Sequence, residues 1–489
     1  MKRPERPAAA SRRTNLGFAL GLLIAVFGLL TLVPLLWIPV FRAEGRLASA
    51  FWVPSAVSIL LGIALAAMFW RGRRRVLTLT DGAAIVLLVW VYACLAGAVP
   101  FMLAQRLDFL RALFESVSGL TTTGLSVVNV ESCSHLVIFW RSWLQFVGGA
   151  GFAIVMMSAI IGPFAAALVR AEGHTQPLMP HVRSSAGVFL LIYSGYTVAG
   201  ILAYVVAGMR VFDAVVHSCS ALSTGGFSSQ ASSIGAYHSP AIELVTMVLM
   251  LLGATSFVLH HDLWRGRPRA LLRSPEPWLA AGMLALAVPL LVVVAARALP
   301  VGFGTALRVG VFEAISALTT TGYTTTNYAR WSGLGILVLI VLMTVGGATA
   351  STAGGVKQLR VFLLLKSVVW DIRRRFLPRN AVICHTMPSS SGRVEVTADD
   401  MVQVANFAFL YLGTYVLGVV LLLAAGCSLS DSAFEFASAL ATTGLSVGVT
   451  TPTASPLVLW TEIGGMFLGR LEFLVVITGV VRIVAGRGR

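Results

Sequence analysis

One short phrase, rich in glycine and hydroxyl-bearing residues, occurs four times in this chain, each time between strongly apolar runs. Each copy starts with serine and has a glycine six positions later, so the four register glycines correspond to one another: Gly124, Gly226, Gly322 and Gly444. They are on the order of 100 residues apart, which indicates repeated sub-domains and not a solenoid of small units. Any fold of this chain must therefore accommodate four similar polar loops within apolar surroundings.

Composition identifies those surroundings. The chain has 489 residues, of which 57% are hydrophobic and 11% are charged, whereas soluble domains carry about 25% charged residues. Several apolar runs reach the length of about 20 residues that a helix needs to cross a bilayer. The sequence predicts an all-α polytopic membrane protein in contact with membrane lipid.

The net charge of +16 could indicate a nucleic-acid-binding protein, but its distribution argues against that class. Lys and Arg gather in short segments at the ends of apolar runs, namely residues 2–13, 71–75, 265–273, 357–379 and 482–489. Cytoplasmic segments of membrane proteins have such an excess of positive charge. We expect these segments, and with them both termini, to be cytoplasmic, and we expect no nucleic-acid partner.

The apolar pattern divides the chain into a front module and four repeats. Residues 1–75 hold two expected membrane helices, at 15–41 and 47–70, and no glycine phrase follows them. Each repeat has a membrane helix, a half-helix, the glycine phrase and a second membrane helix. The four repeats cover residues 76–165, 185–263, 276–375 and 400–485. The expected second helices lie at 136–161, at 240–260, from 333 onward and at 456–485, and a polar loop at 378–400 precedes the last repeat.

A glycine-rich segment interrupts the second membrane helix of the third repeat. Between Gly346 and Gly355 it has four glycines and three hydroxyl residues, and each glycine costs a helix about 1 kcal/mol relative to alanine. Small residues also permit close helix crossings, but that alternative needs one small residue per turn and not a continuous run. We therefore expect a mobile gating loop at 346–356, with Gly346, Gly347, Gly354 and Gly355 as its functional glycines.

The glycine phrase has the chemistry of a cation site. Irregular backbone at membrane depth is tolerated where protein buries it or where it lines a water-filled path. Rings of backbone carbonyls can replace the water shell of a cation, and glycine lets such carbonyls approach without a β-carbon in the way. Each half-helix also directs its partly negative C-terminal end toward the phrase.

The half-helices carry titratable residues: Glu115, Glu313 and Glu435, with His217 at the matching place in the second repeat. Ionisable residues inside a membrane are functional candidates. The acids precede the register glycine by nine positions, so we expect them to lie behind the ion path and to accept hydrogen bonds from loop amides.

Several motifs in order resemble the Trk/Ktr/HKT superfamily of potassium transporters over nearly the whole chain. They are the four glycine phrases, Phe139-Trp-Arg-Ser142 with Gly148-Gly149, Ser239-Pro-Ala-Ile-Glu243, Gly354-Gly-Val-Lys357 and Gly469-Arg-Leu-Glu472. The front module is similar to the TrkH branch and not to the shorter KtrB branch. The resemblance implies four repeats around a pseudo-four-fold ion pore that takes up potassium across a bacterial inner membrane.

The resemblance also implies site residues and partners. K⁺, the transported ion, would bind at Thr122, Thr123, Gly124, Thr224, Gly225, Gly226, Thr320, Thr321, Gly322, Thr442, Thr443 and Gly444. No bound organic cofactor is implied in this chain. The implied assembly is a homodimer on a ring of cytoplasmic nucleotide-binding subunits resembling TrkA, which would bind NAD or ATP.

Arg470 is implied as an electrostatic barrier that projects into the pore. From the residues alone, a buried salt bridge with Glu462, Glu472 or a neighbouring helix is the alternative. We expect Lys357 to be an ordinary lysine at the cytoplasmic end of a helix, although it could also meet a partner subunit.

Two copies of the phrase depart from the others. The second has Gly225 where the others have threonine, and the fourth has Ala441 where the first and third have threonine. The ring is therefore an imperfect four-fold ring. In the related plant transporters, serine at the first register glycine accompanies Na⁺ preference, so Gly124 favours K⁺.

Two other functions are open from the sequence. One is a K⁺/Na⁺ or K⁺/H⁺ symporter that acts without a partner subunit. The other is a membrane-embedded enzyme, for which His217 beside Ser218 is the one tempting base–nucleophile pair, but such a pair needs an orienting third group. We expect a transporter and not an enzyme.

Overall fold

The computed structural model describes residues 9–70, 78–150, 182–378, 385–389 and 392–485. Within these ranges, six helical segments are long and apolar enough to cross a membrane: Leu16–Trp37, Ser49–Met68, Thr80–Gln105, Gly187–Val206, Pro275–Ala298 and Ala398–Ala424. A bent pair, Pro240–Ala254 with Phe257–Trp264, is a seventh candidate. The predicted polytopic helical membrane protein is confirmed.

The front module is a tight helical hairpin of α1 (Ala9–Leu30) and α2 (Ser49–Met68). Two glycines allow the close approach, since a methyl group on Gly21 would lie 2.6 Å from the carbonyl oxygen of Gly62. Small residues at helix contacts are typical of membrane proteins. Between the helices the chain forms two 3₁₀ turns, Val33–Trp37 and Arg42–Leu47, so the first expected helix ends earlier than predicted.

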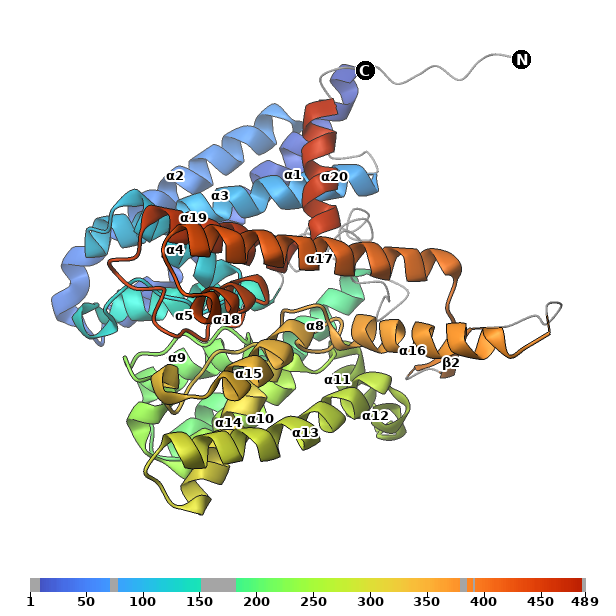
Figure 1. The fold of residues 1–489 in the computed structure, drawn as a ribbon. Coiled ribbons are helices and arrows are strands. Elements are labelled where there is room, and N and C mark those ends of the chain that lie inside the picture. The colour runs from blue at the N-terminus through green and yellow to red at the C-terminus, as the bar shows by residue number, and fades with distance from the viewer. Residues whose placement is uncertain (1–8, 71–77, 151–181, 379–384, 390–391, 486–489) are drawn as a thin grey trace, which may run out of the picture.

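Each repeat has a long helix, a half-helix and a second helix. Their bounds are α3 (Leu79–Gln105), α4 (Phe109–Leu120) and α5 (His135–Gly149); α8 (Val182–Val206), α9 (Val211–Leu222), α10 (Pro240–Ala254) and α11 (Phe257–Trp264); α13 (Pro275–Ala298), α14 (Phe303–Leu318), α15 (Gly333–Val345) and α16 (Gln358–Arg375); and α17 (Ala398–Ala424), α18 (Leu429–Leu440), α19 (Pro456–Leu471) and α20 (Phe473–Ala485). In Figure 1 the half-helices α4, α9 and α18 lie between longer helices.

Two of the expected second helices are broken. The one expected at 240–260 bends by 103° between α10 and α11, where the amide of Phe257 donates to the carbonyl of Ala350 at 3.0 Å. The one expected at 456–485 breaks at Glu472, whose φ is 62° and whose carboxylate pairs with Arg360 at 2.8 Å. Both breaks are stabilised by distant parts of the chain. The expected helix at 136–161 continues only to Gly149 before the described residues end.

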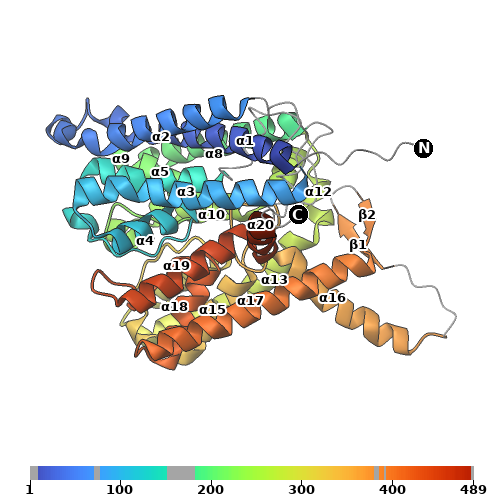
Figure 2. The same cartoon turned by 90° about the horizontal axis from the view of Figure 1, so that it is seen from above.

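The expected polar loop at 378–400 contains a small β-hairpin. Strand β1 (Thr386–Ser389) pairs antiparallel with β2 (Gly392–Glu395), so the fold is not purely helical. The carbonyl of Thr386 accepts from Lys366 of α16 at 3.2 Å. Figure 2 shows the hairpin at the same end of the molecule as the short helix α12 (Arg269–Arg273) and the start of α1, opposite the turn between α1 and α2.

Candidate functional site

The four half-helices end in the same unusual way. The residue that follows the C-cap of each half-helix is a threonine with a left-handed backbone. These residues are Thr122 (φ 56°), Thr224 (51°), Thr320 (50°) and Thr442 (51°). The next amide donates back to the serine that opens each phrase, as from Thr123 to the carbonyl of Ser118 at 2.9 Å. This is the Schellman ending, in which glycine is usual. Threonine there is strained, by about 1–3 kcal/mol per residue.

The register glycines follow two residues later, also with positive φ, of 96°, 75°, 82° and 90°. Each lies directly against the next repeat. A methyl group placed on Gly124 would lie 2.2 Å from the carbonyl oxygen of Gly225, and one on Gly226 would lie 2.0 Å from that of Thr321. A methyl group on Gly322 would lie 1.9 Å from the carbonyl oxygen of Thr443, and one on Gly444 would lie 2.1 Å from that of Thr123. The contacts run from repeat one to two, three, four and back to one. The four phrases therefore form one closed ring of glycines and carbonyls.

Buried acids hold the ring from behind, as the sequence predicted. The carboxylate of Glu115 accepts from the amide of Val127 at 2.7 Å and from Ser126 Oγ at 2.6 Å. Glu435 accepts from the amide of Val447 at 3.0 Å and from Ser446 Oγ at 2.6 Å. All three half-helix glutamates, Glu115, Glu313 and Glu435, are fully buried. The serine that ends each of these two phrases, Ser126 or Ser446, therefore links the phrase to the glutamate of its half-helix.

The third and second repeats use the same arrangement with variations. Glu313 accepts from the amide of Thr325 at 2.8 Å and from the hydroxyl of Tyr328. His217 takes the place of the acid in the second repeat, with Nδ1 2.8 Å from the carbonyl of Asp213 and Nε2 3.0 Å from Ser228 Oγ. A carbonyl only accepts, so Nδ1 carries a proton.

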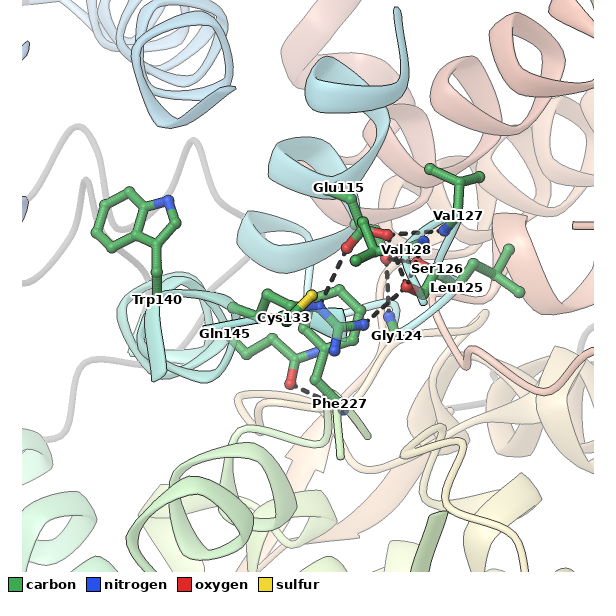
Figure 3. Close-up of polar contacts among 12 residues, drawn as sticks. Glu115, Gly124, Leu125, Ser126, Val127, Val128, Cys133, Trp140, Gln145 and Phe227 are labelled. Carbon is green, nitrogen blue, oxygen red and sulfur yellow. Dashed lines mark hydrogen bonds and ion pairs between the residues drawn. The ribbon is translucent and has the colours of Figure 1, made fainter. Parts of the chain in front are cut away.

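Arg141 links the first two repeats. Its Nε lies 3.2 Å from the Glu115 carboxylate, one nitrogen donates to Ser126 Oγ at 2.8 Å, and its guanidinium stacks 4.0 Å from the ring centre of Phe227. Figure 3 shows Glu115, Ser126 and Phe227 close to Gly124. The sequence placed Arg141 in a motif but gave it no role.

The glycine-rich loop lies directly below the ring and is not helical. The amide of Gly354 donates to Thr320 Oγ1 at 2.7 Å, and a methyl group on Gly354 would lie 2.1 Å from the carbonyl oxygen of Ala441. Thr352 Oγ1 donates to the carbonyl of Leu222, 3.0 Å away. The loop therefore contacts the half-helix ends of repeats two, three and four, and the alternative of a helix crossing is wrong.

The glycines of this loop bring its two ends together. A methyl group on Gly346 would lie 2.2 Å from the carbonyl oxygen of Gly354, and one on Gly347 would lie 2.4 Å from Ala353. Gly346 and Gly355 have φ of 71° and 76°, a region that favours glycine. The four predicted glycines thus form the closely packed base of the loop.

Two cations border the loop. Arg470 donates to the carbonyl of Thr352 at 2.6 Å and to that of Gly148 at 2.7 Å, so it joins the loop to the end of α5. Its predicted alternative partner Glu472 pairs with Arg360. Lys357 turns back and donates to the carbonyl of Ala353 within the loop. Lys357 is the N-cap residue of α16, so it lies at a helix end as expected and also contacts the loop.

Sequence reasoning included Thr122, Thr224, Thr320 and Thr442 among the expected ligands but did not anticipate their strained backbone. It also gave no role to the side chains of α5 that hold the ring. A signal for this backbone was present in the sequence, because all four copies have threonine two residues before the register glycine, whereas the positions on either side of that threonine vary. The signal for the side chains of α5 was the presence of Arg141 and Gln145 in a mostly apolar helix, since polar groups inside a membrane are costly.

Comparison with known proteins gives consistent matches. The TrkH family, cation transport protein, matches residues 54–273 and 288–484. The Trk system potassium uptake protein TrkH of Halomonas elongata is 33% identical over 475 residues, which are 94% of this chain and 96% of that protein. The TrkH protein of Salmonella typhimurium is 31% identical over 473 residues, 92% of this chain and 95% of that protein. The crystal structure of the potassium transporter TrkH from Vibrio parahaemolyticus is similar with a TM-score of 0.85 and 27% identity, over 98% of this chain and 99% of that one.

These matches exclude the enzyme alternative. The pair on which it depended is also not formed, since Ser218 Oγ donates to the carbonyl of Thr197 at 2.7 Å and His217 contacts Ser228 instead. The chain is a transporter and not an enzyme: it belongs to the TrkH family of cation transport proteins.

Proposed function

We propose that this chain takes up K⁺ across a bacterial inner membrane through the ring of the four register glycines. The observation that supports this most strongly is the closed set of glycine–carbonyl contacts, at 1.9–2.2 Å for an added methyl group. Such a ring leaves no room for side chains, so backbone oxygens are the groups available to an ion. Carbonyl oxygens that replace hydration water are the known means of binding K⁺ in channels.

The proposed ligands are the oxygens of the two residues before each register glycine and of the glycine itself. The half-helices support this role, because each ends at the ring with its partly negative C-terminus. The glutamates behind the ring are each engaged by loop amides and hydroxyls.

We propose the loop 346–356 as the gate. Its contacts with Thr320, Ala441 and Leu222 support this role, because they lie beneath three of the four phrases. Opening would require these contacts and the Arg470 bonds to the loop to break. In this arrangement Arg470 would act both as a positive barrier below the ring and as a latch that closes the loop.

The proposed assembly is a homodimer on a cytoplasmic TrkA-like subunit that binds NAD or ATP. Support comes from the relatives, which carry the name of the Trk potassium uptake system. Support for cytoplasmic termini comes from the shared location of α12, the hairpin and the start of α1 at one end (Figure 2), since α12 contributes basic residues that favour the cytoplasm.

Flux from liposomes tests the proposal. Purified protein in vesicles loaded with K⁺ should release K⁺ down its gradient, and Gly322→Asp should abolish this flux because a charged side chain would fill the ring. Normal flux in Gly322→Asp would refute the assignment of the ring. Flux that requires a Na⁺ or H⁺ gradient would identify coupled symport, and a flux that changes when a co-purified nucleotide-binding subunit is added would support the proposed partner.

A further inference from the structure

The second copy of the phrase lacks a side chain that the others have. At the position before the register glycine the four copies have Thr123, Gly225, Thr321 and Thr443. In the first and third copies this threonine is held by a hydroxyl two residues earlier, at 2.8 Å in both cases. The second copy has glycine here and must stabilise its loop differently.

Gln145 of α5 occupies the place of the missing side chain. A methyl group on Gly225 would lie 2.4 Å from Cδ, 2.6 Å from Oε1 and 2.8 Å from Nε2 of Gln145. The two residues therefore exclude each other: a side chain at position 225 and a glutamine at position 145 cannot both fit. Gln145 is fully buried.

The amide group of Gln145 makes hydrogen bonds on both sides of the register glycine. Its Nε2 donates to the carbonyl of Gly225 at 2.6 Å, and its Oε1 accepts from the amide of Phe227 at 3.1 Å. Figure 3 shows Gln145 extending from its helix toward Phe227. A planar amide that makes both bonds fixes the orientation of the intervening peptide groups.

The carbonyl held by Gln145 is part of the ring. Its oxygen is the one that faces Gly124, at 2.2 Å from a methyl group there. A carbonyl oxygen has two lone pairs, so it can accept from Gln145 and still face the ring. One of the four ring carbonyls is therefore positioned and partly neutralised by a side-chain amide from another repeat.

We propose that Gln145 is a positioning residue for the ring: it substitutes for the side chain absent at Gly225 and thereby sets the discrimination between K⁺ and Na⁺. This inference rests on the proposed function, because it assumes that the Gly225 carbonyl faces the transported ion. A purely structural role would affect stability and total flux equally for both ions. A positioning role changes the ratio of the two fluxes.

A double-variant cycle tests the pairing. Gln145→Leu removes both hydrogen bonds while filling the space, and we expect it to lower the K⁺/Na⁺ flux ratio about tenfold, the equivalent of one net hydrogen bond. Gly225→Thr alone should have at least that effect because of the clash. Combined with Gln145→Ala, Thr at position 225 gains the vacated space and a hydroxyl partner in Ser223, as Thr123 has in Thr121. This double variant should recover the native ratio to within about threefold.

Two results would overturn the proposal. One is a Gln145→Leu protein that retains the native K⁺/Na⁺ ratio, even if its total flux is lower. The other is a double variant that is no more selective than Gly225→Thr. Thermal unfolding of the same variants in detergent measures the pairing without any transport, and there too the double variant should be more stable than Gly225→Thr. If the native chain transports no K⁺ but the double variant recovers thermal stability, the proposed function fails and the pairing of Gln145 with Gly225 stands. If the double variant recovers no stability, the pairing fails.

Discussion

A single methyl group at Gly322 should remove selective K⁺ flux. Its carbon would lie 1.9 Å from the carbonyl oxygen of Thr443, whereas carbon–oxygen contacts normally begin at about 3.3 Å, so one loop must move by roughly 1.4 Å. The left-handed φ of 82° adds about 1–2 kcal/mol of strain for any residue with a β-carbon. Because misplacement by about 1 Å at a functional centre costs on the order of 100-fold, we expect a loss of K⁺ flux of that size in Gly322→Ala.

A matched control separates the contact from the strain. Gly426 has a similar φ of 95°, and no atom in the described part of the chain lies within 4 Å of a methyl group placed there. Gly426→Ala should therefore lose about 1–2 kcal/mol of stability and keep its flux. Both variants are assayed by K⁺ release from liposomes and by thermal unfolding. Equal fluxes in the two variants would refute the reasoning that the ring contact at Gly322 matters.

Three further predictions concern the groups around the ring. Arg470→Ala removes the bonds to Thr352 and Gly148, so basal K⁺ flux without a partner subunit should increase; unchanged flux would exclude both the barrier and the latch. Thr352→Val keeps the shape of the side chain but removes the hydroxyl that donates to the carbonyls of Leu222 and Gly253. Basal K⁺ flux should rise by up to about tenfold, which corresponds to one net hydrogen bond, and the K⁺/Na⁺ flux ratio should not change. A changed ratio would contradict a role confined to the gate. Glu435→Ala leaves the part-buried amide of Val447 and the buried amide of Thr450 without their acceptor. At about 1–3 kcal/mol for each group, it should destabilise the protein by up to about 6 kcal/mol; a stability loss below about 1 kcal/mol in thermal unfolding would show that the carboxylate is not a brace.

The elements nearest the ring were predictable because their signal is local. The half-helix α4 begins at Phe109 as expected, since the apolar pattern and the following phrase are contiguous in sequence. The bracing role of Glu115 followed from its spacing to Gly124 alone. Because the phrase occurs four times, a feature shared by all four copies supports a structural prediction more strongly than the same feature in a single copy.

The breaks in the second helices were not predictable from local pattern. The segment at 240–260 is predominantly apolar, and its bend involves the amide of Phe257, which bonds to Ala350 in another repeat. The break at Glu472 depends on Arg360, 112 residues away. The role of Gln145 likewise appears only when Gly225 lies beside it. These features depend on tertiary contacts, which override the helical preference of the local sequence.

The location of the bound ion is the most direct test of the account. Tl⁺ is a heavy substitute for K⁺, and anomalous scattering from crystals grown with Tl⁺ would locate it without reference to transport. We expect a peak on the axis enclosed by Gly124, Gly226, Gly322 and Gly444, which K⁺ displaces at lower concentration than Na⁺. A transport-active protein with Tl⁺ bound elsewhere in the membrane and none within the ring would contradict the central claim.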